Sequence, residues 1–170
     1  MAKYGKFALM IAVSTAVMLA LTYLNVYQAQ HIHFSETRLF MALIMGAAMA
    51  VVMLAFMRGM YDSRRANMLV VVAALGVAAL ALWLMRSQDT VGDVAYMKAM
   101  IPHHSIAILT SERAEIRDPR VRELADRIID AQKKEIGEMD ALIRDIERNG
   151  AQGTAVLKPE HGQGEQQASR

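Results

Sequence analysis

Charge is distributed very unevenly along this chain, and that division limits the folds open to it. Before Arg86 the acidic residues are Glu36 and Asp62 alone, whereas acidic and basic residues crowd together from Arg86 onward. Long segments without charge favour lipid, and dense mixed charge favours water. The sequence therefore predicts a membrane-embedded region over residues 1–86 and a water-exposed module over residues 87–150.

Three apolar runs are long enough to cross a hydrocarbon core of about 30 Å, which takes roughly 20 helical residues. They cover residues 7–27, 39–57 and 68–85. Lys3 and Lys6 give the first run a positive start, but this run is long for a signal peptide and no clear cleavage site follows it. We therefore expect a retained anchor and three membrane spans.

The positions of lysine and arginine predict the orientation, because these residues are enriched in cytoplasmic loops. They gather before the first run and between the second and third, as Lys3, Lys6, Arg58, Arg64 and Arg65. The amino terminus is thus expected in the cytoplasm of a bacterial-type cell. The first loop and the module should lie outside the inner membrane, in the periplasm. All five histidines fall on this outer side.

The second run carries a methionine at every fourth residue, as Met41, Met45, Met49, Met53 and Met57. One interpretation is packing, because flexible methionine side chains fill gaps between helices. The other is a ladder of thioethers that relays Cu(I) across the membrane. Intramembrane charges or histidines often mark such pathways, and none accompanies the methionines.

Two amphipathic helical patterns follow, over residues 93–117 and 119–149. Asp118 is an expected N-cap for the second helix, and Gly150 an expected terminator. The polar tail, 151–170, is predicted to be disordered. The fold class is therefore all-α: three transmembrane helices followed by a two-helix hairpin. A lone hairpin buries little apolar area, so we expect a homodimer that forms a four-helix bundle, or docking onto the spans.

Thioether and imidazole groups interrupt the apolar face of the first module helix. Met97, Met100 and His104 are spaced i, i+3 and i+7, which places them on one helix face, and His103 lies at its flank. Pro102 removes a backbone donor and is expected to bend the helix beside the two histidines. This face is a candidate metal site.

On the second helix, Gln132 and Met139 are two turns apart, and Glu135 lies between them at the edge of the face. A buried polar group without a partner costs about 1–3 kcal/mol, so His104 needs a partner. A purely structural alternative is a hydrogen bond from His104 to Gln132 or Glu135. The apolar face predicted for this helix comprises Leu124, Ile128, Gln132, Met139, Ile143 and Ile146.

The chain contains no cysteine, so any metal must be held by histidine, methionine, carboxylate or amide groups. Thioethers select Cu(I) and imidazole also binds copper, which makes copper the expected metal. His31 and His33 in the first outer loop form a weaker candidate site. Their alternative role is that of two histidines at the lipid headgroups.

The strings MKAMIPHHSIAI (97–108) and LADRIIDAQKKEIGEM (124–139) resemble the family called domain of unknown function 305. This resemblance implies a ferritin-like four-helix bundle, and some members of the family are periplasmic copper-binding proteins. The residues that it implicates are Met97, Met100, His103, His104 and Met139, with Gln132 and Glu135 in support. Three leading spans resemble a membrane-anchored subset of the family. Two departures are Ser105, where many members have glutamine, and a tail without the methionine-rich repeats of dedicated copper carriers.

The leading hypothesis is a membrane-anchored periplasmic protein that captures or buffers copper and passes it to an efflux partner. The alternative is a structural or adaptor protein whose hairpin dimerises or docks on a partner. An enzyme is not expected, because no Glu-x-x-His, P-loop or zinc-protease motif occurs. Nucleic-acid binding is not expected either, because the net charge is only +2 and there is no basic patch.

Overall fold

The structure is a computed structural model that describes residues 2–157, and this part of the chain is helical without strands. Its long helices are α1 (Ala2–Leu21), α2 (Glu36–Phe56), α3 (Arg64–Ser87), α4 (Asp93–Arg113) and α5 (Pro119–Asn149). Two short 3₁₀ turns are η1 (Ala29–His31) and η2 (Arg58–Met60). The predicted all-α class is confirmed. The predicted tail lies outside the described residues from position 158 onward.

Three helices are long and apolar enough to span a membrane: Lys3–Leu21 of α1, α2 and α3. The first ends at Leu21, earlier than the predicted Tyr27. Just beyond this end, Arg38 Nη1 donates a hydrogen bond of 2.7 Å to the Thr22 carbonyl. The segment that follows is therefore not membrane helix, and it is free to make other contacts.

Helix α2 lies between the other two spans and packs against both of them. At its crossing with α1, Gly46 faces Thr15 so closely that an added Cβ would lie 2.2 Å from Thr15 Oγ1. Small residues at such a crossing let two helix backbones approach. Part of the methionine face points outward, since Met41 and Met45 are 49% and 40% exposed.

The Gly46→Ala variant is expected to weaken the packing of α1 on α2 by about 1–3 kcal/mol, because overpacking forces backbone shifts. Thermal unfolding of the full chain in detergent micelles measures this loss. The double variant Gly46→Ala/Thr15→Ala removes the clashing hydroxyl and should recover most of the stability. Equal stability of the single variant and the unchanged chain would show that this crossing is loose.

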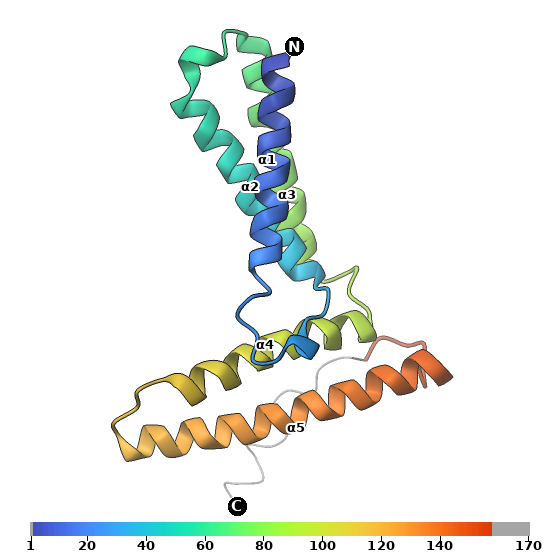
Figure 1. The fold of residues 1–170 in the computed structure, drawn as a ribbon. Coiled ribbons are helices and arrows are strands. Elements are labelled where there is room, and N and C mark those ends of the chain that lie inside the picture. The colour runs from blue at the N-terminus through green and yellow to red at the C-terminus, as the bar shows by residue number, and fades with distance from the viewer. Residues whose placement is uncertain (1, 158–170) are drawn as a thin grey trace, which may run out of the picture.

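The hairpin of α4 and α5 lies across the end of the span bundle, opposite the amino terminus (Figure 1). Helix α4 is nearer to the spans and α5 is farther from them (Figure 1). The predicted cap is present, because Asp118 Oδ1 accepts a hydrogen bond of 2.9 Å from Arg120 N. Gly150 ends α5 with a φ of 80°, a conformation that favours glycine.

The hairpin core is formed by apolar residues that meet between the two helices: Met97, Ile101, Ile108, Ile129, Ile136 and Ile143. On α5 the prediction holds for Ile143, which is buried, and for Met139 and Ile146, which pack against the core. Leu124 and Ile128, expected in the core, are 48% and 36% exposed. The face of α5 that packs on α4 carries Ala125 and Ile129 instead, and Tyr27 of the first outer loop packs against the same core. Tyr27, the predicted last residue of the first span, is therefore part of the packing of the hairpin.

Candidate functional site

The candidate site begins on α4, where Met97 lies on the side facing α5. Met97 is buried in the hairpin core, and Met100 is half-buried. His104 is half-buried on the same face, whereas His103 is exposed. Consecutive helical residues point about 100° apart, so the two histidines face different surroundings. Their ring centroids are 6.2 Å apart. The structure thus partly buries His104 on the helix face that carries Met97, and it leaves His103 exposed.

His104 has no hydrogen-bond partner for its buried Nδ1 within the described part of the chain. Glu135 Oε2 lies 3.2 Å from this nitrogen, but the orientation of the two groups does not make a hydrogen bond. Burial lowers the pKa of His104, the Glu135 carboxylate raises it and His103 lowers it further. The net effect is a lowered pKa, which favours the neutral imidazole at pH 7. A neutral imidazole can offer a nitrogen lone pair to a ligand.

Helix α5 brings the other predicted residues to this flank. Gln132 Nε2 donates a hydrogen bond of 3.4 Å to Glu135 Oε2, so Glu135 lies between Gln132 and His104. A direct pair of His104 with Gln132 is therefore not formed. Met139 packs against the same hydrophobic cluster that contains Met97. Both methionine side chains thus approach the interface of the two helices.

The donors gathered here suit a soft metal ion better than a hard one. Within residues 2–157, no group of three or more histidine, aspartate or glutamate side chains is arranged to hold a metal. A zinc or calcium site would need several such ligands. The donors that do lie at this flank include the His104 imidazole and the thioethers of Met97 and Met139, and thioethers favour Cu(I).

His31 of the weaker predicted pair lies on the opposite side of the hairpin and is buried there. Its Nδ1 is 2.9 Å from Ser105 Oγ, and Tyr27 N donates a hydrogen bond of 2.7 Å to the same oxygen. Ser105 is fully buried. Because Nδ1 is engaged by Ser105, the structure gives His31 a role in docking the loop. Nothing in the sequence pattern singled out Ser105 for this contact, although it stood out as a departure from the family.

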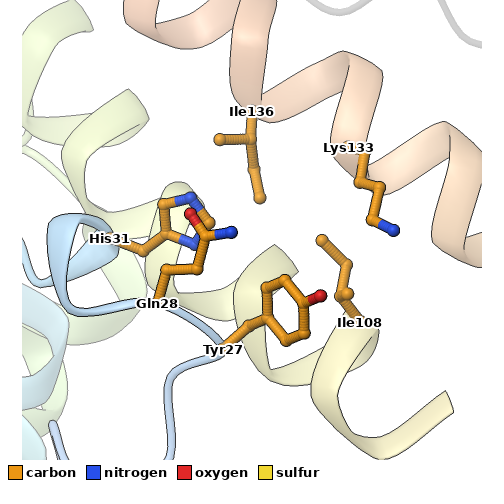
Figure 2. A pocket seen from close by; sticks show the side chains of 6 residues that line it. All are labelled: Tyr27, Gln28, His31, Ile108, Lys133 and Ile136. Atoms are coloured by element: carbon orange, nitrogen blue, oxygen red, sulfur yellow. The ribbon is translucent and has the colours of Figure 1, made fainter. Parts of the chain in front are cut away.

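A pocket of about 310 Å³ lies beside this contact, between the loop and both hairpin helices (Figure 2). Tyr27, Gln28 and His31 line one wall, and side chains of α4 and α5 line the other, namely Ile108, Lys133 and Ile136 (Figure 2). Lys133 Nζ also lies 3.2 Å from Glu112 Oε1, which neutralises its charge. The pocket therefore carries no unpaired cation for an anionic ligand.

Acidification is expected to loosen the docked loop. Burial lowers the pKa of His31, while Asp140 raises it and His33 lowers it. The docked state therefore holds His31 neutral, so docking is stable above the free imidazole pKa of about 6.5. This stability is lost as the pH falls through the lowered pKa of the docked state.

Spin labels at Gln28→Cys and Lys134→Cys report the distance between loop and α5. The distance should be short and narrowly distributed at pH 7.5 and broad at acid pH. His31→Gln should abolish this response, and His33→Ala should keep it. A distance that does not change with pH in the otherwise unchanged chain would contradict the expectation.

Comparisons with known proteins found a family match and one relative. The family model "Domain of unknown function (DUF305)" matches residues 93–170, which include α4 and α5. The chain is also 30% identical over 106 residues to "Uncharacterized protein L153" of Acanthamoeba polyphaga mimivirus, covering 61% of this chain and 68% of that protein. No solved structure matches the chain. These similarities extend beyond the short motif around His103 and His104.

Proposed function

This chain belongs to the DUF305 family, a domain of unknown function, and we propose its function from its own side chains. The protein is a membrane-anchored metal-binding protein that captures a soft ion, copper first, at the outer face of the membrane. The hairpin of α4 and α5 holds the ion, and the three spans keep it at the membrane.

One observation carries this proposal: the Nδ1 atom of His104 is buried without a hydrogen-bond partner on a helix face that also bears Met97 and Met100. Leaving such a nitrogen unpaired costs about 1–3 kcal/mol, and a bound ion would supply the missing partner. Met139 supplies a further thioether from α5. Glu135 and Gln132 act as supporting polar groups, and His103 is an accessory ligand at the exposed edge.

The proposed location is the periplasmic side of a bacterial-type inner membrane. Three helices suit a membrane span by length and composition, and the hairpin lies at the end opposite the amino terminus (Figure 1). The cytoplasmic assignment of the amino terminus rests on the lysines and arginines around Lys3 and Arg64. The hairpin then faces the periplasm.

The proposed role is binding and not catalysis. The captured ion is buffered at the membrane or passed to an efflux partner, which is an expected protein of unspecified identity. The proposed assembly is a homodimer, since the hairpin of a single chain leaves apolar residues such as Leu124 half exposed. Burial of such residues is the main driving force for association.

Cu(I) titration of the full chain in nanodiscs, against a competing chelator, tests the proposal. The full chain is needed because the first outer loop forms part of the hairpin core. His104→Ala is expected to weaken binding by more than about tenfold, and the adjacent exposed His103→Ala much less. Binding that is no tighter than in the double variant His103→Ala/His104→Ala would overturn the metal role and favour the adaptor role.

A further inference from the structure

Helix α5 exposes a line of apolar side chains that nothing in the chain covers within residues 2–157. Val121, Leu124, Ile128 and Leu142 are 49%, 48%, 36% and 52% exposed. Val121, Ile128 and Leu142 are separated by multiples of seven residues and so share one face of the helix. We call these four residues the α5 stripe.

The α5 stripe lies on the flank of the hairpin opposite the docked loop. Lys133 and Ile136 of α5 line the pocket that contains Tyr27 and His31. At about 100° per residue, Ile128 projects on the other side of the buried face from Lys133. The loop therefore covers one flank and leaves the α5 stripe open.

The charges beside the stripe change sign along the helix. Arg120 and Arg127 flank its first half, and Glu138 and Asp145 flank its second half on the same side. Within the chain, ion pairs join Arg120 to Asp118, Arg127 to Glu123 and Glu138 to Lys134. Exposed pairs of this kind are worth little, so these charges can exchange partners. An antiparallel copy of α5 would place Arg127 against Glu138 and Arg120 against Asp145, because both pairs are centred between Gln132 and Lys133. A parallel copy would place like charges together. The stripe is thus complementary to itself in the antiparallel direction only.

The apolar residues also pair in the antiparallel direction, and their centre of symmetry lies about one residue from that of the charges. An antiparallel copy places Val121 opposite Leu142 and Leu124 opposite Met139. Such self-complementarity is what a two-fold symmetric interface requires.

The membrane imposes the same direction of pairing. α5 runs across the axis of the spans (Figure 1), so it lies roughly parallel to the membrane plane. Two copies inserted the same way are related by a two-fold axis along the membrane normal. That axis turns a helix in the membrane plane antiparallel to its copy.

We propose that the α5 stripe binds a second copy of this chain, with the two α5 helices antiparallel. This pairing bears on the proposed metal site and to that extent rests on the proposed function. In the dimer, Leu124 and Ile128 of the second copy would cover Met139 and Glu135. The pairing thereby excludes water from the flank that carries His104. Only this closing effect depends on the metal role; the pairing itself does not.

Because the natural chain has no cysteine, single cysteines map the interface. Ala131 lies next to the centre of symmetry, so Ala131→Cys should crosslink to its own copy with a short bis-maleimide in the membranes of expressing cells. The adjacent Asp130→Cys points away from the stripe and should not. Val121→Cys should not crosslink to itself, since the two copies are about 30 Å apart along the helix axes. Co-expressed Val121→Cys and Leu142→Cys chains should crosslink to each other.

Exchanging the charges of Arg127 and Glu138 tests the antiparallel direction independently of the crosslinks. Arg127→Glu should weaken dimerisation about three- to tenfold, because two symmetric contacts are lost. Arg127→Glu/Glu138→Arg should restore it. Circular dichroism confirms that each variant keeps its helices.

Three results would overturn the inference: no crosslinking of a folded Ala131→Cys chain, equal crosslinking at Asp130→Cys, or efficient self-crosslinking of Val121→Cys. Loss of Cu(I) binding in a chain that still crosslinks at Ala131→Cys would instead count against the proposed metal role alone.

Discussion

Ile108→Ala is expected to lower the stability of the hairpin by about 2–5 kcal/mol. Ile108 is only 1% exposed and contributes to the core between α4 and α5. It also lines the pocket beneath the docked loop. Removing its side chain therefore leaves a cavity that neither helix can easily fill. Hydrogen exchange of the α4 and α5 amides in the full chain measures the loss, because it separates the hairpin from the membrane spans.

Tyr96→Ala on the same helix is the matched control. Tyr96 is 55% exposed, so its removal should change the exchange of the hairpin amides little. Similar effects of the two variants would show that α4 and α5 are not packed through Ile108.

Met97→Leu/Met100→Leu is expected to weaken Cu(I) binding by about 100-fold. Leucine nearly conserves the volume of methionine, so the hairpin should keep its fold while it loses both thioethers of α4. The loss follows from the preference of Cu(I) for soft sulfur ligands. Competition titration of the full chain in nanodiscs measures the change in affinity.

Met41→Leu/Met45→Leu is the control for this experiment. These two methionines point outward from α2, so their replacement should leave the affinity of the hairpin unchanged. An equal loss in both variants would place the binding methionines in the membrane region instead of the hairpin.

The elements of the fold could be predicted because each depends on local sequence. The length of the apolar runs predicted the three spans, and the change in charge density at Arg86 predicted the boundary between the spans and the hairpin. Asp118 and Gly150 marked the ends of α5 through cap chemistry that involves only neighbouring residues. The end of α1 at Leu21 was not predictable in this way. Just beyond this end, the Thr22 carbonyl accepts a hydrogen bond from Arg38 of the next helix, a contact between distant positions that no local pattern indicates.

The loop contact illustrates why the rest could not be predicted. His31 and Ser105 are 74 positions apart, and a serine carries no pattern that identifies its partner. The buried face of α5 is likewise set by a tertiary contact, the packing of α5 on α4. Helical periodicity placed Leu124 and Ile128 in the core, and the tertiary contact leaves both half exposed.

Metal binding by the candidate residues stays a prediction, and the structure adds where their side chains lie. Spacing placed Met97 and His104 on one face, and the structure agrees. The proximity of His104 to Glu135 was among the alternatives and is present at 3.2 Å. The M-I-P-H-H string suggested that His103 and His104 act as a pair, but the helix turns them toward different surroundings.

X-ray absorption spectroscopy of the full chain loaded with Cu(I) tests the central claim most directly, because it identifies the atoms bound to the metal. The account predicts copper bound by both sulfur and imidazole nitrogen, with the sulfur signal lost in Met97→Leu/Met100→Leu and the nitrogen signal reduced in His104→Ala. A chain that retains no copper, or copper bound only by nitrogen and oxygen, would contradict it.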